Sequence, residues 1–301
     1  MTAAITSSSL LAVSIPWGGI VVLVLGVVTY RWGVPALARG LASSPERVRF
    51  RDVVPRRKQW AWFVGIALLA IEQSWPALEL ARRISLVAYL LHNLLLVLAV
   101  VPLLLLGLPS WAIFRLTEPR GVDALVTFFT RPLVATVIFS GITILSLLVP
   151  IVEAQAHSLV VYIYLQVVLV LAGIALWVPA LRLTPGVEKL SNGARVLFLF
   201  AQSLIPSFPA VALIFAKRSF YPVFARNVHL VFGVSAIGDQ QLAGALSKIL
   251  TLAILWTTAV AILARAQNRE DRGDDPEPIT WLDVERELRR SSSGNSPGSA
   301  R

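Results

Sequence analysis

The stretch Ile84–Leu108 reads ISLVAYLLHNLLLVLAVVPLLLLGL, and no Asp, Glu, Lys or Arg occurs from Ile84 to Phe114. Because about 20 consecutive apolar residues cross the hydrocarbon core of a bilayer, this stretch predicts a transmembrane helix. It contains one histidine, His92, followed by Asn93. Imidazole and amide groups are costly in lipid, so we expect both side chains to face other helices or a wet cavity.

The whole composition agrees with a membrane protein. Of 301 residues, 56% are hydrophobic and 15% are charged, and the mean hydropathy is +0.73. Soluble domains carry about 25% charged residues, so we predict an all-α, polytopic membrane protein. The chain has no cysteine, which excludes disulfides, thiolate metal sites and cysteine nucleophiles. The net charge of +10 is better explained by membrane topology than by nucleic acid, so no nucleic-acid partner is expected.

Apolar runs separated by charged loops predict seven transmembrane helices. Before Arg31 the chain has no charged side chain, which indicates a retained first helix rather than a cleaved signal peptide. The predicted helices are Ile15–Tyr30, Trp60–Leu78, Ile84–Leu108, Pro132–Val152, His157–Leu181, Val196–Ala216 and Gln240–Ala264. Pro206 and Pro209 predict a kink in the sixth. The segment from Ser110 to Arg131 is predicted to lie on the membrane surface.

Most Lys and Arg residues fall on alternate connections. The first of these loops, between Tyr30 and Trp60, holds Arg31, Arg39, Arg47, Arg49, Arg51, Arg56, Arg57 and Lys58. Since positive loops stay in the cytoplasm, we predict an N-terminus outside and a C-terminus inside, in a bacterial inner membrane. The membrane domain is expected over residues 1–266. Residues 267–301 are predicted to form a mostly disordered cytoplasmic tail with one short helix at Thr280–Arg290.

Polar side chains gather in the half of the membrane that is predicted to be outer. His92 lies eight residues after Ile84, about 12 Å along the helix, and Gln166 and Lys248 lie at similar depths in the fifth and seventh helices. The polar residues of this half and its rim are Glu72, His92, Asn93, Ser146, Glu153, His157, Gln166, His229, Asp239, Gln240, Gln241 and Lys248.

Imidazole and carboxylate suit Cu(II) or Zn, so the group could form a metal or proton site open to the outside. His92, His157 and Asp239 are the candidate metal ligands. The alternative for His92 is an interhelical hydrogen bond to Gln166 or Ser146. Glu72 and Lys248 could instead form a buried ion pair, or Lys248 could extend toward the membrane surface.

Two stretches resemble the CtaG family of cytochrome c oxidase assembly proteins. YLLHNLLLVLAVVPLLLLGLP at residues 89–109 resembles the histidine-bearing third helix of that family, and DQQLAG at residues 239–244, followed by Lys248, resembles the start of its last helix. YRWG (30–33), RPLVATVIFSGITILSLLVP (131–150) and AHSLVVYIYLQ (156–166) occur in the same order. The resemblance implies a bacterial inner-membrane protein that helps to assemble a haem–copper oxidase and handles copper.

The chain departs from the family pattern at positions where the family carries candidate ligands. Ala88 stands where the family has the first of two histidines in its third helix. Leu147 and Leu148 replace a tryptophan–histidine pair in the fourth helix, and Leu165 and Gln166 stand near an expected glutamate–histidine pair in the fifth. A full family metal site cannot be built from the remaining residues, which indicates a reduced site or a scaffold alone.

Three functions follow as hypotheses. The first is a non-enzymatic assembly factor for a cytochrome c oxidase that binds copper at the outer face through His92, His157 and Asp239. The second is a metal-free membrane scaffold that docks on oxidase subunits. The third is a proton or solute transporter that uses Glu72, His92 and Lys248 as a relay. No phosphate-binding glycine loop, nucleophile with adjacent base or catalytic carboxylate pair appears in the sequence.

Overall fold

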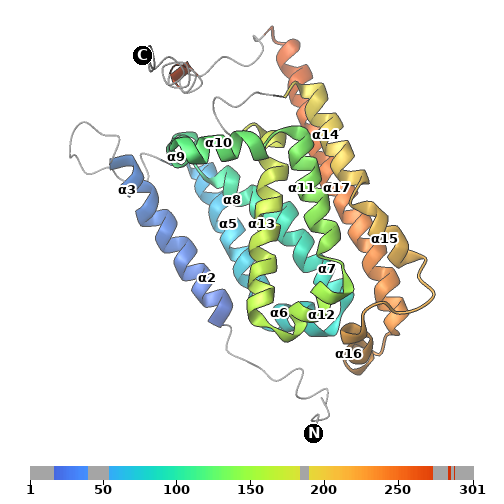
Figure 1. Cartoon of the computed structure of the whole chain (residues 1–301). Helices are drawn as coiled ribbons and strands as arrows, with labels where there is room; N and C mark the ends of the chain where they lie inside the picture. The colour runs from blue at the N-terminus through green and yellow to red at the C-terminus, as the bar shows by residue number, and fades with distance from the viewer. Residues whose placement is uncertain (1–16, 40–53, 184–189, 274–283, 286–287, 289–301) are drawn as a thin grey trace, which may run out of the picture.

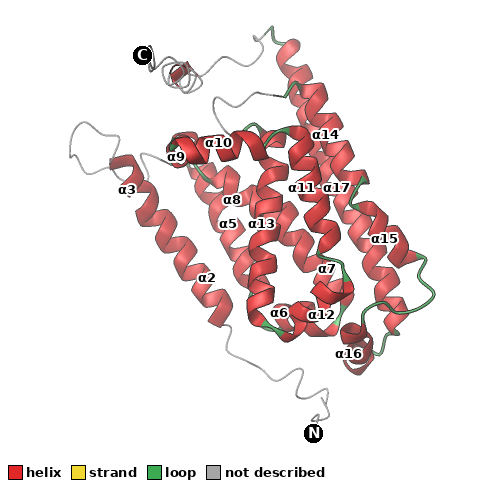
Figure 2. Ribbon diagram, viewed as in Figure 1, coloured by secondary structure: helices red, strands yellow, loops and turns green. Residues whose placement is uncertain are grey.

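The protein is a bundle of helices (Figure 1). The structure, a computed structural model, describes residues 17–39, 54–183, 190–273, 284–285 and 288. Within these residues every regular element is helical and no strand occurs (Figure 2). The elements are α2 (Trp17–Val28), η1 (Thr29–Gly33), α3 (Val34–Arg39), α5 (Arg56–Glu72), α6 (Ala77–Glu79), η2 (Leu80–Ile84), α7 (Leu86–Leu95), η3 (Leu96–Val100), α8 (Val101–Gly107), α9 (Ser110–Thr117), α10 (Arg120–Phe129), α11 (Pro132–Leu145), α12 (Val149–His157), α13 (Leu159–Leu181), α14 (Asn192–Leu204), α15 (Ser207–Ile214), α16 (Pro222–Phe232) and α17 (Ala236–Glu270), where η marks a π-helical turn.

The helices are long and apolar enough for a multi-pass membrane protein. Five continuous helical segments pass this test among the described residues, and up to seven spans result if each of two bent pairs is one span. The five are Trp17–Ala38, Leu86–Gly107, Leu159–Leu181, Asn192–Ile214 and Ala236–Glu270. The bent pairs are Arg56–Glu72 with Ala77–Ile84, and Arg120–Phe129 with Pro132–Leu145. The all-α polytopic fold is thus confirmed.

Short helices close the two ends of the bundle (Figure 1). Helices α9 and α10 lie across one end, which we call the α10 end, and α10 meets α11 at 77°. Helices α6, α12 and α16 close the opposite end, which we call the α12 end. The predicted sidedness would put the α12 end outside and the α10 end in the cytoplasm.

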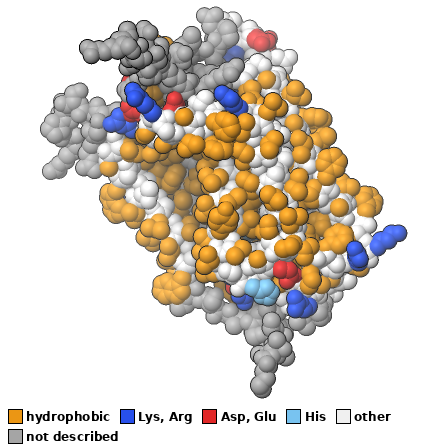
Figure 3. Space-filling view, viewed as in Figure 1, with side chains coloured by type: hydrophobic (Ala, Val, Ile, Leu, Met, Phe, Trp, Pro, Cys, Tyr) orange, Lys and Arg blue, Asp and Glu red, His pale blue; other side chains and the backbone are white. Residues whose placement is uncertain are grey.

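The surface has the pattern of a membrane protein. On the face shown in Figure 3, hydrophobic side chains form a broad belt, and Lys and Arg side chains gather on the rims above and below it. Large apolar residues on this bundle are strongly exposed, among them Leu133 (83%), Val160 (77%) and Phe208 (72%). Such exposure is expected where lipid rather than water is the solvent, because apolar side chains lose nothing by facing acyl chains.

Prolines follow two helix ends that were not predicted. The second helix was predicted to reach Leu78, but α5 ends at Glu72 and the chain turns by 65° before resuming after Pro76. The fourth was predicted to reach Val152, but α11 ends at Leu145 and a new helix, α12, takes Pro150 into its first turn. A proline has no N–H to donate and restricts the residue before it, so it favours the start of a helix over its interior.

The other predicted helices are present, but their ends differ from the predicted residues. The predicted interruption of the sixth is confirmed, since α14 ends at Leu204 and α15 begins after Pro206. The surface segment forms α9 and α10, whereas α16 was not predicted at all. The seventh helix runs as α17 from Ala236 to Glu270, so residues 267–270 continue it. The predicted helix at Thr280–Arg290 lies largely outside the described residues.

Glycines allow the helix backbones to approach closely. A Cβ atom on Gly107 would lie 2.8 Å from the Trp62 side chain and 2.9 Å from its backbone, which joins α8 to α5. A Cβ on Gly244 would lie 2.6 Å from the carbonyl oxygen of Ala210, which joins α17 to α15. In lipid, where apolar burial drives helix association weakly, such close contacts at small residues supply much of the packing energy.

Candidate functional site

The acidic start of α17 caps another helix. Asp239 is buried, and its Oδ1 accepts a hydrogen bond from Ser85 Oγ at 2.6 Å while its Oδ2 accepts from the Leu86 N–H at 2.7 Å. Ser85 Oγ in turn accepts from the Ala88 N–H, as the N-terminal cap of α7. A helix start leaves free N–H groups that need acceptors, and Asp239 supplies one from a distant part of the chain.

The two glutamines after Asp239 hold the connection between α15 and α16. Gln240 is fully buried; its Oε1 accepts from the Phe220 N–H at 2.8 Å and its Nε2 donates to the Arg218 carbonyl at 3.2 Å. Gln241 Nε2 donates to the Ala216 carbonyl at 3.1 Å. The DQQ sequence therefore ties the start of α17 to two neighbouring segments.

A second set of polar contacts joins the helices of the α12 end. The Arg82 guanidinium donates to the Gln155 carbonyl, and Gln155 Nε2 donates back to the Arg82 carbonyl, both at 3.2 Å. Asn227 Nδ2 of α16 donates to the Arg83 carbonyl at 2.7 Å. These bonds connect η2, α12 and α16, so polar groups hold this end together in addition to the apolar core that Val152 and Phe224 join.

His157 lies on the surface of this end. Its side chain is 71% exposed, and Nε2 lies 3.8 Å from Oε2 of Glu153 one turn earlier. Arg226 of α16 also lies 3.8 Å from that Glu153 oxygen, while Glu153 Oε1 accepts from the Val223 N–H at 2.7 Å. Glu153 thus caps the start of α16 and pairs with a cation, an arrangement that opposes binding of a further metal cation.

Tyr221 connects the same end to the break between α11 and α12. Its hydroxyl donates to the Leu147 carbonyl at 2.8 Å. Burial raises the pKa of Tyr221 to about 12, so the hydroxyl remains protonated and able to donate at neutral pH. The contact satisfies a backbone carbonyl at the break between α11 and α12.

His92 belongs to a chain of hydrogen bonds between three helices. Its Nε2 lies 3.0 Å from the hydroxyl of Tyr162 on α13, which donates to Gln73 Oε1 at 2.9 Å at the end of α5. With the Gln73 amide oxygen assigned as the acceptor, the Tyr162 proton is committed, so His92 Nε2 is the donor to the tyrosine oxygen. The predicted interhelical bond of His92 exists, but its partner is Tyr162 and neither Gln166 nor Ser146.

Two ionisable groups lie beside this chain of bonds. The Arg82 guanidinium carbon lies 5.2 Å from the centre of the Tyr162 ring, within cation–π range. Glu72, 3% exposed, precedes Gln73, and neither of its carboxylate oxygens has a hydrogen-bond partner among the described residues. We call Glu72, Gln73, Arg82, His92 and Tyr162 the tyrosine cluster.

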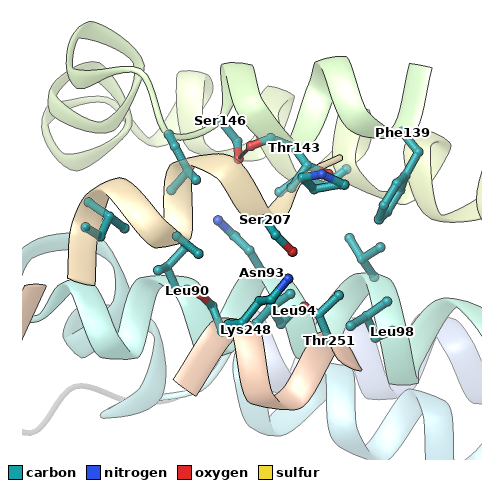
Figure 4. A pocket seen from close by; sticks show the side chains of 17 residues that line it. Leu90, Asn93, Leu94, Leu98, Phe139, Thr143, Ser146, Ser207, Lys248 and Thr251 are labelled. Carbon is teal, nitrogen blue, oxygen red and sulfur yellow. Dashed lines mark hydrogen bonds between the residues drawn. The ribbon is translucent and has the colours of Figure 1, made fainter. Parts of the chain in front are cut away.

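The remaining predicted polar residues lie on another side of α7. Gln166 Nε2 donates to Asn93 Oδ1 at 3.3 Å, joining α13 to α7. Asn93 also lines a cavity together with Lys248 of α17 (Figure 4). No ion pair or hydrogen bond joins Lys248 to Glu72 within the part of the chain that the structure describes, so of the two alternatives for these residues the ion pair is not formed.

The three candidate metal ligands are not brought together. His92 bonds to Tyr162, Asp239 caps α7, and His157 lies exposed beside Glu153. Among the described residues no group of three or more His, Asp or Glu side chains could hold a metal ion. These side chains therefore do not fit a shared copper centre. The side chain of His229, in α16, is outside the described residues.

Sequence reasoning missed the residues that connect the tyrosine cluster. Tyr162, Gln73, Arg82 and Gln155 were not predicted as site residues, although Tyr162 stands four residues before Gln166 and so shares a face of α13 with it. This four-residue spacing could have identified Tyr162 as a site residue. The polar face of α13 runs from Tyr162 to Gln166 and meets His92 and Asn93, which are adjacent on α7.

Apolar spans, a charged rim at each end and polar groups committed to contacts between helices define an integral membrane protein of the helical-bundle class. Comparison with known proteins identifies the family. The family model described as cytochrome c oxidase caa3 assembly factor (Caa3_CtaG) matches residues 28–269. The chain belongs to this family. No curated protein and no solved structure matches it.

Proposed function

We propose that this protein assists assembly of a haem–copper cytochrome c oxidase as a non-enzymatic scaffold in a bacterial inner membrane, docking on oxidase subunits. The observation that carries the proposal is the family match over residues 28–269, which covers nearly all of the described bundle. The family resemblance also favours a bacterial location, and the charge distribution favours an orientation with the α12 end outside.

The roles of the polar residues support a scaffold over a copper carrier. A carrier needs ligand atoms that converge at about 2 Å on one point and are free to exchange. Asp239 uses both carboxylate oxygens to cap α7, and His92 Nε2 is bonded inside the bundle. Conversely, a scaffold gains from rigid ends and well-fixed helices, which these bonds provide. Copper binding by this chain stays a prediction.

Complementation of a strain that lacks the gene tests the proposal. We expect loss of the gene to lower oxidase activity and the haem a absorbance of isolated membranes, and the His157→Ala variant to restore both to the wild-type level. His157 is the suitable probe because it is the exposed candidate ligand, so its replacement should not disturb folding.

Two results would contradict the proposal. Normal oxidase levels without the gene would exclude an assembly role. Failure of His157→Ala to complement, at wild-type protein abundance and with rescue by added copper, would favour the copper relay instead. The copper content of the purified wild-type protein, compared with that of the purified His157→Ala variant, distinguishes a scaffold from a copper relay independently of oxidase activity.

A further inference from the structure

Helix α17 places a cation against a cavity inside the bundle. The cavity, of about 60 Å³, lies between α7, α11, α13, α15 and α17. Figure 4 shows Lys248 of α17 and Ser207 of α15 among the side chains around it, with Asn93 of α7 and Thr143 of α11. Most of the other lining side chains are apolar, and none is acidic.

Lys248 has no counter-ion in the part of the chain that the structure describes. Among the described residues, no carboxylate lies within ion-pairing distance of its ammonium group, and no hydrogen bond to it occurs there. The neighbouring hydroxyls donate to their own helices, Ser207 to the Ser203 carbonyl and Ser247 to the Gly244 carbonyl. Their oxygen atoms can still accept, but they bring no negative charge to the cation.

The depth of Lys248 decides what could neutralise it. It stands nine residues after Asp239, about 14 Å along α17 from the rim of the α12 end. A lysine side chain extends several ångströms, so a lipid phosphate at the headgroup level would not lie beside it. A carboxylate on a second transmembrane helix can reach the same depth. Cations within the membrane usually pair with groups of this kind.

We propose that a transmembrane helix of an oxidase subunit docks against the bundle where this cavity opens, and that an Asp or Glu side chain of that helix enters the cavity and pairs with Lys248. This inference rests on the proposed function and adds to it the site and the chemistry of the partner. The cavity admits the carboxyl group and not the helix itself, because most of its lining side chains are buried, and the Thr251 hydroxyl lies among the lining groups.

Site-specific photo-crosslinking in the native membrane tests the docking site. A photoreactive amino acid replaces Thr251, which lines the cavity. This replacement is made in three full-length proteins: one that keeps Lys248, one with Lys248→Met and one with Lys248→Arg. We expect a crosslink to an oxidase subunit, identified by mass spectrometry, in a transmembrane segment that contains Asp or Glu. The yield should fall at least tenfold in Lys248→Met and return in Lys248→Arg, because the interaction depends on the positive charge.

The controls separate docking from folding and from general proximity. The same photoreactive group at Val160, which is 77% exposed on α13 and outside the cavity lining, should not give the crosslink. Thermal unfolding of Lys248→Met should occur at or above the wild-type temperature, since an unpaired cation is removed. Replacement of the partner's Asp or Glu by Asn or Gln should lower the crosslink yield as much as Lys248→Met does. Combining the two replacements should lower the yield no further.

Three results would overturn the inference. These are a crosslink that persists in Lys248→Met, a crosslink to phospholipid instead of protein, and a crosslink to a segment without an acid. Each would contradict the carboxylate pairing while leaving the assembly role intact. A charge-dependent crosslink to a membrane protein outside the oxidase would instead support docking at Lys248 and contradict the proposed function.

Discussion

Residues that read as ligands in the sequence act as connectors in the structure. Asp239 was predicted as a metal ligand because an acid at a helix start near histidines suits a cation, but the nearest unsatisfied groups are the N–H and hydroxyl at the start of α7. His92 likewise finds a tyrosine hydroxyl. In a low-dielectric interior, polar groups without a partner are costly, so the bonds of Asp239 and His92 to groups of neighbouring helices stabilise the fold.

The hydroxyl of Tyr162 provides a test at this scale. Tyr162→Phe keeps the ring and its contact with Arg82 but leaves His92 Nε2 and Gln73 Oε1 without their shared partner. We expect the free energy of unfolding in detergent to fall by about 1 kcal/mol, since interhelical hydrogen bonds in membrane proteins contribute roughly that amount. Unfolding titrations in denaturing detergent measure it.

Tyr164→Phe is the matched control. Tyr164 lies two residues away on the same helix, its side chain is 71% exposed, and no hydrogen bond of its hydroxyl occurs within the described ranges. Its replacement should leave the unfolding free energy unchanged. Equal losses in the two variants would mean that the Tyr162 hydroxyl contributes nothing specific to the tyrosine cluster.

At the scale of helices, packing depends on a few small residues and on proline breaks. Prolines ended α5 and α11 earlier than hydropathy alone indicated, because an apolar run remains apolar through a bend. Hydropathy reports burial in lipid and not backbone continuity. It therefore located the apolar segments but could not place α12 and α16, whose apolar patterns are short and interrupted.

Gly244 tests the contact between α15 and α17. Gly244→Ala would place a Cβ atom 2.6 Å from the Ala210 carbonyl oxygen, so the two backbones must move apart. We expect a loss of about 1–3 kcal/mol in unfolding free energy, the range typical of overpacking. The same unfolding titration measures this loss.

Gly141 offers a control with the same substitution. No atom beyond its own helix lies within 4 Å of a Cβ built there, in the interior of α11. Gly141→Ala should leave stability unchanged or raise it slightly, because alanine is the better helix former. A loss at Gly141 as large as that at Gly244 would indicate a general effect of glycine in these helices rather than close packing.

At the scale of the whole molecule, the orientation of the bundle in the membrane can be tested. The absence of native cysteine makes single-cysteine labelling direct. His157→Cys at the α12 end and Asp271→Cys just after α17 are both exposed positions. Since the positive loops favour the cytoplasm, a membrane-impermeant maleimide should label His157→Cys in intact cells and Asp271→Cys only after the membrane is opened. The reverse pattern would show that the charge distribution does not set the orientation of this protein.

The sequence by itself determined the class, the approximate spans and the family, since these depend on the length of apolar runs and on a few local motifs. Only the tertiary structure decided the roles of the polar residues. Hydrogen-bond partners such as Asp239 and Leu86, 153 residues apart, are set by how helices meet. Helical spacing says which side chains share a face but not which neighbour that face touches. The three predicted metal ligands therefore separated into a helix cap, an interhelical bond and a surface pair.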